Sequence, residues 1–250
     1  APDVIINATA FTAVDKAESE PEMAMAINAI AVGVMAEEAK RLNIPLIHYS
    51  TDYVFDGQSD QAWRETALVA PINVYGETKL AGERAIQQSG CHYLILRTSW
   101  VYGARGQNFL LTMRRLGRER NALSVVADQI GAPTWSRHIA DATAQILAQY
   151  TGISAQSDDY WHQHSGIYHL AASGQGSWYD FAHAIFEHLS VQGEKMAVLS
   201  KTTTAAYPTP AQRPLFSCMN TDKLTETFSI RLPDWQDSLQ LVLADLDTKL

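Results

Sequence analysis

Pro45-Leu-Ile-His-Tyr-Ser-Thr-Asp-Tyr-Val54 and His92-Tyr-Leu-Ile-Leu-Arg-Thr-Ser-Trp-Val101 are two largely apolar stretches on either side of a helical segment, Val74 to Gln88. Both stretches are short and rich in aliphatic and aromatic residues, which is typical of buried strands. Two strands joined by a helix form a βαβ unit, and such units build parallel sheets. This part of the chain therefore predicts an α/β fold.

The alternation of strands and helices continues on both sides of this unit. Further strands are predicted at Val4 to Ala8, Leu123 to Val126 and Ile167 to Ala172. Further helices are predicted at Pro21 to Leu42, Asn108 to Arg120, Ser136 to Tyr150, Trp178 to Leu189 and Leu239 to Leu246, with a polar loop over Ile153 to Gly166. This order favours a doubly wound parallel sheet. After about Thr151 strands and helices no longer alternate regularly. We therefore expect a larger domain over residues 1–150 and a smaller lobe over 151–250, from which some segments return to the sheet.

The composition narrows the class of protein. The chain has 250 residues, 46% of them hydrophobic and 18% charged, which is enough for a sizeable core. No apolar run reaches the ~18 residues of a membrane span. The net charge is −8, and the nearest approach to a basic stripe is expected on a solvated helix face: Arg114, Arg115, Arg118 and Arg120. Cys91 and Cys218 lack disulfide or metal spacing, so we expect a cytoplasmic protein without nucleic-acid or membrane partners.

Tyr75 and Lys79 form the first candidate site. At positions i and i+4 they lie on one face of the predicted helix. A phenol has an unperturbed pKa of ~10, and a nearby ammonium is expected to lower it. A tyrosine tuned in this way can give a proton to a carbonyl oxygen while hydride reaches the carbon. Because the same spacing occurs by chance on exposed helices, the pair needs support from its surroundings.

That support comes from the residues that end the two strands. Thr51 ends the first strand and Trp100 lies at the end of the second. Ligands bind at the carboxyl ends of parallel strands. The Thr51 hydroxyl could hold a substrate oxygen there or complete an ordinary turn, and Trp100 could wall a sugar ring or pack in the core.

Several longer motifs, in order along the chain, resemble one family. They are Asn7-Ala-Thr-Ala-Phe-Thr-Ala-Val-Asp-Lys-Ala-Glu-Ser19, Ser50-Thr-Asp-Tyr-Val-Phe-Asp-Gly57, Asn73-Val-Tyr-Gly-Glu-Thr-Lys-Leu-Ala-Gly-Glu83, Arg97-Thr-Ser-Trp-Val-Tyr-Gly103, Asp128-Gln-Ile-Gly-Ala-Pro-Thr134 and Tyr207-Pro-Thr-Pro-Ala-Gln-Arg-Pro214. Together they are similar to the dTDP-4-dehydrorhamnose reductases, which belong to the extended short-chain dehydrogenase/reductase superfamily. The resemblance covers the chain from near its first residue to about residue 220.

The resemblance implies a fold and a reaction. The fold is Rossmann-like, with residues 1–150 as the dinucleotide-binding domain and 151–250 mainly as the substrate-binding lobe. The reaction reduces the 4-keto group of dTDP-4-dehydro-L-rhamnose to dTDP-L-rhamnose with NADPH or NADH. The product is a precursor of cell-surface polysaccharide such as the O antigen of lipopolysaccharide. The sequence does not rank the two cofactors, and it leaves a monomer and a homodimer open.

The resemblance also implies roles for individual residues. The expected catalytic residues are Thr51, Tyr75 as proton donor, and Lys79. The expected cofactor-binding residues are Ala10, Phe11, Thr12, Tyr75 and Lys79. The expected substrate-binding residues are Thr51, Asp52, Trp100, Asn108, Phe109 and Arg213. Arg213 is a candidate for the pyrophosphate, since a guanidinium matches phosphate oxygens well, but it could equally form a surface ion pair.

Two features depart from the family pattern. The family begins with a strand and a glycine-rich turn that holds the cofactor pyrophosphate. No such turn is present here, so we expect that an N-terminal βαβ unit is absent from this sequence. Some members hold Mg²⁺ through an acidic residue soon after the Gly-Ala-Pro-Thr motif. Because Arg137 follows it here, the residues do not support that metal, and His162 and His164 lack a carboxylate cluster beside them.

Two alternatives to the reductase stay open at this stage. The first is another nucleotide-sugar enzyme, a 4-epimerase or 4,6-dehydratase. A dehydratase commonly has Asp-Glu after the strand-end threonine, where this chain has Asp52-Tyr53. The second is a non-catalytic regulatory binding subunit of the same fold, as known for methionine adenosyltransferase. The Thr51, Tyr75 and Lys79 set argues against it.

Overall fold

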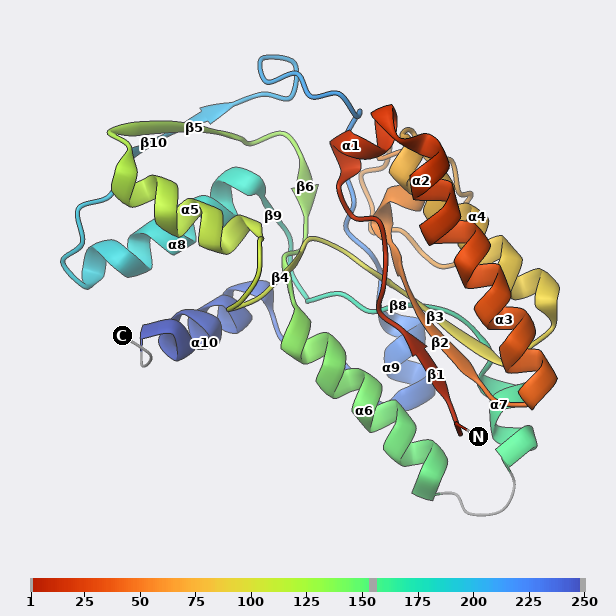
Figure 1. Cartoon of the computed structure of the whole chain (residues 1–250). Helices are drawn as coiled ribbons and strands as arrows, with labels where there is room; N and C mark the ends of the chain where they lie inside the picture. The colour runs from red at the N-terminus through yellow and green to blue at the C-terminus, as the bar shows by residue number, and fades with distance from the viewer. Residues whose placement is uncertain (1, 153–156, 248–250) are drawn as a thin grey trace.

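The computed structural model describes residues 2–152 and 157–247. One parallel sheet organises the region on the right of Figure 1. Its strands are β1 (Ile5–Asn7), β2 (Leu46–Thr51), β3 (Tyr93–Thr98) and β8 (Gly166–His169), in the order β1-β2-β3-β8. All three pairings are parallel. The predicted α/β class with a parallel sheet is therefore confirmed.

Helices cover both faces of this sheet. On one face α3 (Ala31–Leu42) and α4 (Val74–Ser89) pack on Leu46 and Ile95. On the other face α6 (Ser136–Gly152), α7 (Ser157–His164) and α9 (Asp222–Phe228) pack on Ile47, Leu94 and Leu96. Neighbouring residues of a strand thus point to opposite helical layers, as the period of a strand requires. This arrangement explains why the strands are apolar throughout rather than alternating with polar residues.

The predicted helix over Pro21 to Leu42 contains a wider turn. It consists of α2 (Pro21–Met25), a π-helical turn η1 (Ala26–Ile30) and α3, and a short helix α1 (Val14–Ser19) precedes it. The π turn holds Asn28, which is buried, accepts from the Phe11 backbone N–H at 2.8 Å and donates to Thr78 Oγ1 at 3.1 Å. Gly82 permits this contact, because a Cβ there would lie 2.2 Å from the Asn28 carbonyl oxygen. The turn therefore fixes the loop after β1 against α4.

A second group of elements forms a core of its own. Here β5 (Ala122–Val126) pairs in parallel with β10 (Val198–Thr202). The two strands share a core with α5 (Phe109–Glu119), α8 (Trp178–Val191) and α10 (Trp235–Asp247). The remaining short strands join the two groups: β4 (Val101–Tyr102) with β7 (Thr134–Trp135), and β6 (Ile130–Gly131) with β9 (Gly176–Ser177). None of the helices in the described ranges is long and apolar enough to cross a membrane.

Several sequence expectations are corrected by this arrangement. The loop expected over Ile153 to Gly166 contains α7 in its described part, while residues 153–156 lie outside the described residues. The segment was expected to be a loop because most of its residues are polar. It forms a helix in which Tyr160 and Trp161 bury their rings against Tyr150. The strand at β5 belongs to the small sheet and not to the main one. Helix α10 begins at Trp235 rather than Leu239, and α9 and β10 were not predicted.

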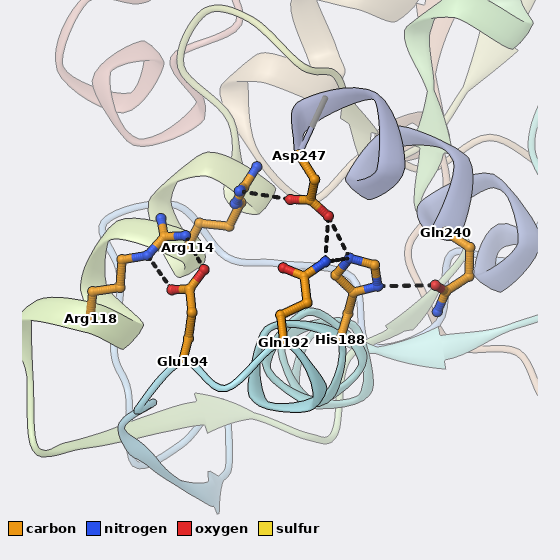
Figure 2. Close-up of polar contacts among 7 residues, drawn as sticks. All are labelled: Arg114, Arg118, His188, Gln192, Glu194, Gln240 and Asp247. Carbon is orange, nitrogen blue, oxygen red and sulfur yellow. Dashed lines mark hydrogen bonds and ion pairs between the residues drawn. The ribbon is translucent and has the colours of Figure 1, made fainter. Parts of the chain in front are cut away.

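The arginine stripe on α5 is not a wholly solvated face. Arg114 is buried, and its Nη2 lies 3.5 Å from Asp247 Oδ1, while Arg118 pairs with Glu194 at 2.6 Å. Figure 2 shows how Asp247 also meets His188 of α8 and Gln192, which follows that helix, at 2.9 and 2.6 Å. His188 reaches on to Gln240 of α10 at 3.2 Å. Polar contacts therefore connect α5, α8 and α10 around one carboxylate.

We expect Asp247→Asn to destabilise the protein in a pH-dependent way. Burial raises the pKa of Asp247, but hydrogen bonds from His188 and Gln192 outweigh it and hold that pKa below its usual value. A lowered acid pKa gives stability that is present above about pH 4 and is lost as pH falls through the folded-state pKa. The loss in Asp247→Asn should be about 1 kcal/mol at neutral pH and should shrink in acid.

Thermal unfolding across a pH series measures this, with the exposed Asp60→Asn as a control that changes the same charge in a loop. An equal loss at every pH would show that the side chain of Asp247 matters only for its packing.

Candidate active site

The start of α4 is fixed against the ends of the sheet strands. Asn73 caps the helix, accepting from the Gly76 backbone N–H at 2.8 Å and donating to the Gln212 carbonyl at 2.8 Å. Gly76 allows α4 to touch the 3₁₀ turn η2 (Asp52–Val54), since a Cβ there would lie 2.2 Å from the Tyr53 carbonyl oxygen. Tyr75 is thereby held in the first turn of α4, beside Thr51 at the end of β2.

Tyr75 is hydrogen-bonded to Thr51 and lies edge-on to Tyr53, with ring centroids 5.7 Å apart. Burial raises the pKa of Tyr75 to about 12, and the hydrogen bond from Thr51 opposes this rise only in part. The net shift of this pKa is therefore upward and not downward as expected, and the ammonium of Lys79 is not among its causes. Helical spacing places Tyr75 and Lys79 on one face, but it carries no information about how deeply the phenol is buried.

The ammonium of Lys79 is directed elsewhere. The residue is buried, and its Nζ lies 2.6 Å from the Tyr49 carbonyl oxygen and 3.1 Å from His48 Nε2. Burial lowers the pKa of Lys79 to about 8, while the carboxylate of Glu83 opposes this shift. A sizeable fraction of Lys79 can therefore be uncharged near neutral pH, whereas an exposed lysine is almost fully charged there.

Tyr75 and Lys79 line a cavity of about 390 Å³ beside the loop that follows β1. The expected cofactor residues Ala10 and Thr12 also line it, whereas Phe11 does not and instead bonds its backbone to Asn28. The other lining residues are Ala8, Thr9, Tyr49, Ser50, Thr98, Val101, Ser136, Ile139 and Ala140. Small side chains on one wall and a buried lysine on the other suit a flat ring and a sugar hydroxyl.

A second cavity, of about 360 Å³, lies between the two groups of elements. Its lining residues are Asp15, Tyr53, Phe109, Met113, Ser124, Val125, Val126, Gln129, Trp178, Tyr207, Thr209 and Arg213. Phe109 and Arg213 were expected at the substrate, and Arg213 is held by Asp15 at 2.9 Å. Asn108 does not line this cavity, because its side chain caps α5 and bonds to Gly103 and Arg105.

Trp100 stands behind the second cavity. Its ring stacks on Trp178, with centroids 3.7 Å apart and planes 7° from parallel, and Trp178 is the residue that lines the cavity. Trp100 also has a positive φ of 45°, which is rare for a bulky residue. Sequence reasoning missed Trp178, Tyr53, Gln129 and Tyr207. Tyr53, Gln129 and Tyr207 fall inside the motifs quoted above, so their position gave a signal, whereas nothing around Trp178 did.

Comparisons with known proteins agree with this geometry. The family model described as "RmlD substrate binding domain" matches residues 1–248. The dTDP-4-dehydrorhamnose reductase of Escherichia coli K12 is 49% identical over 249 residues, which cover 99% of this chain and 81% of that protein. The chain belongs to the dTDP-4-dehydrorhamnose reductase family.

Solved structures of the family have the same fold. The reductase of Bacillus anthracis, crystallised in complex with NADP, has a TM-score of 0.84 at 36% identity, covering 98% of this chain and 81% of that one. The reductase of Clostridium acetobutylicum has a TM-score of 0.86 at 35% identity with the same coverage. The Rossmann-like class expected from the resemblance is thus confirmed.

Asp52 is a buried acid directly after Thr51. The residue is 2% exposed, and its Oδ2 has no hydrogen-bond partner among the described residues. Burial raises the pKa of Asp52 to about 7, although the hydroxyls of Ser217 and Thr51 oppose the rise. A buried oxygen that lacks a partner beside Thr51 is ready to receive a hydroxyl from a ligand. Across the described ranges no three histidine, cysteine or acidic side chains gather as a metal site would need.

We expect Asp52→Asn to stabilise the protein above neutral pH. A raised acid pKa means that ionisation costs free energy in the folded state, so stability falls as pH rises from about 4 through about 7. The variant should gain roughly 2–4 kcal/mol over the parent in mild alkali and little near pH ~4.

Urea unfolding at a series of pH values measures this difference, with Asp60→Asn as the exposed control. A stability difference that does not change with pH would mean that Asp52 is not held in a raised-pKa environment.

Proposed function

We propose that this chain reduces the 4-keto group of dTDP-4-dehydro-L-rhamnose to dTDP-L-rhamnose with NADPH or NADH. One observation carries the proposal. Tyr75, bonded to Thr51, lines the first cavity, and its ring contacts Tyr53, which lines the second. A proton donor therefore stands between a site fit for a nicotinamide and a site fit for a nucleotide sugar. The names of the relatives give the substrate.

The proposed mechanism assigns a task to each catalytic residue. The first cavity would hold the nicotinamide, which would supply the hydride for the substrate carbon. Tyr75 gives its proton to the substrate oxygen as negative charge develops there, and becomes a phenolate. Thr51 donates its hydroxyl hydrogen to Asp52 Oδ1 at 3.0 Å in this structure, and it would turn that hydrogen to the phenolate to stabilise it. Lys79 would hold the ribose of the cofactor through its hydrogen bonds.

The second cavity would hold the nucleotide part of the substrate. Arg213 would bind the pyrophosphate, which requires it to leave Asp15 or to share its guanidinium between two partners. The aromatic rings of Phe109, Trp178 and Tyr207 offer flat apolar surfaces for the base. Trp100 would act through Trp178 as part of the substrate wall, and Asp52 would accept a sugar hydroxyl.

These assignments divide the chain by task. We propose that residues 1–150 mainly carry the dinucleotide site and that 151–250 mainly complete the substrate site, to which Phe109 and Gln129 also contribute. A cytoplasmic enzyme, monomeric or homodimeric and without nucleic-acid partners, fits a net charge of −8. Residue 53 favours a reductase over a dehydratase, because a buried tyrosine stands where a dehydratase commonly has an acid.

The direct test is oxidation of NADPH or NADH on addition of the 4-keto sugar nucleotide, followed by absorbance. Oxidation that appears only with the keto sugar supports the reductase. Release of water or epimerisation without net oxidation would favour the other nucleotide-sugar enzymes, and binding without any turnover would favour the regulatory subunit.

Tyr75→Phe should lower turnover by about 10²- to 10⁴-fold, because one proton donor is lost while the ring is kept. Initial rates and melting temperature are measured together, so that loss of fold is recognised. Tyr102→Phe is the matched control: it removes a buried phenol oxygen that has no hydrogen-bond partner among the described residues and lies in the other core. Equal activity in both variants would remove Tyr75 from the mechanism.

A further inference from the structure

A histidine lies buried beneath the proposed active site and has no role in the mechanism above. His48 stands in the middle of β2 and has no exposed surface. One side of its ring faces Lys79, with Nε2 3.1 Å from Nζ. The other side faces Asn7 of β1, its register partner, with Nδ1 3.0 Å from Asn7 Nδ2. Each ring nitrogen thus has one defined neighbour.

The neighbours of Asn7 decide which nitrogen of His48 carries the hydrogen. Asn7 Oδ1 accepts from the Thr9 backbone N–H at 3.0 Å and from the Thr9 hydroxyl at 2.7 Å. A backbone N–H can only donate, so the amide oxygen must face Thr9 and the amide nitrogen must face His48. His48 Nδ1 must then accept, and the one hydrogen of the neutral ring must lie on Nε2.

This tautomer determines what Lys79 can do. An Nε2–H cannot accept a hydrogen bond from an ammonium, but it can donate to the lone pair of an amine. The same amine can still donate to the Tyr49 carbonyl oxygen, 2.6 Å away. We propose that His48 is a positioning residue, which Asn7 and Thr9 hold in its Nε2–H form so that it fixes the Lys79 side chain in place and favours loss of its proton.

The surrounding charges are compatible with this assignment. Lys79 shares α4 with Tyr75 and Glu83, and the Glu83 carboxylate is engaged by Arg97 of β3 at 2.7 and 2.9 Å. From β2 His48 itself faces it, whereas the phenol of Tyr49 bonds to Thr143 of α6 on the other side of the sheet, and Asn7 of β1 is uncharged. Burial lowers the pKa of Lys79 to about 8 and moves that of His48 well below its ordinary value, with the charge of Lys79 adding to the latter shift. Two buried bases in contact resist holding two protons.

The importance of this contact for turnover rests on the proposed reductase activity, but the tautomer can be tested without substrate. Nitrogen-15 NMR of protein labelled in its histidine rings distinguishes Nε2–H, Nδ1–H and imidazolium, and His48→Gln identifies the signal. We expect the Nε2–H form, without titration between mildly acid and mildly alkaline pH. An Nδ1–H form or an imidazolium at neutral pH would overturn the inference, whatever the enzyme's reaction.

Asn7→Asp is the sharpest variant. An aspartate has the same shape but can only accept, so it should draw the ring hydrogen to Nδ1 and leave the Nε2 lone pair free for a Lys79 ammonium. Asn121→Asp adds the same charge at an exposed position and should leave the tautomer unchanged. If the tautomer stays Nε2–H in folded Asn7→Asp, Asn7 does not orient His48 and the inference is wrong.

Kinetics then separate positioning from plain packing. In His48→Phe we expect kcat to fall about tenfold or more and the limb of the pH–rate profile that belongs to Lys79 to rise by about one pH unit. His48→Gln, whose amide can still donate to Nζ, should restore most of both. Loss of melting temperature in both variants with an unmoved limb would mean that His48 is only a packing residue. If His48→Phe does not fold, the NMR spectrum of the parent protein still tests whether His48 has the Nε2–H form.

Discussion

The close approach of α4 to the end of β2 is the constraint on which the candidate site depends. It needs a residue without a side chain at Gly76, where a Cβ would lie 2.2 Å from the Tyr53 carbonyl, and a cap at Asn73 that starts the helix at that point. Once the helix begins there, its geometry places Tyr75 above Thr51 and Lys79 one turn deeper, under the sheet edge. A helix that began one residue later would turn both side chains away by about 100°. A second close contact joins Gly82 of α4 to the π turn η1. A Cβ at Gly82 would lie 2.2 Å from the Asn28 carbonyl oxygen.

That approach brings an unusual number of polar groups out of water. Charges in such a place are costly unless each has a partner. The strongest pair, Arg97 with Glu83, makes two hydrogen bonds, although Arg97 Nη1 has no partner among the described residues, and it takes up the only carboxylate that α4 carries after Lys79. Lys79 and Asp52 have no such ionic partner, and their pKa values move toward neutrality for that reason, to about 8 and about 7. Groups that titrate near neutral pH are those that proton-transfer sites need.

The sequence predicts the sheet and the strand-end residues because their signals are local. An apolar run, a polar strand end and a helix of known period all lie within a few residues of one another, and these placed Thr51, Tyr75 and Lys79 in one region. Elements that form because of contacts with distant parts of the chain could not be predicted from the local sequence. Helix α7 has polar letters and forms because Tyr160 and Trp161 bury against α6, and β5 finds its partner β10 far along the chain. Trp178 reaches the second cavity only because α8 begins beside Gln129, to which its Nε1 donates at 3.2 Å.

The corrected pKa of Tyr75 also makes better chemical sense than the expected one. A residue that gives a proton at neutral pH must first hold it, and a phenol with a pKa of about 12 is almost fully protonated there. The oxygen that receives the proton develops the basicity of an alkoxide, which is comparable to hydroxide and far more basic than a phenolate. Transfer from Tyr75 is therefore still downhill by several powers of ten once hydride has reached the carbon. Burial thus keeps the proton in place until the substrate requires it.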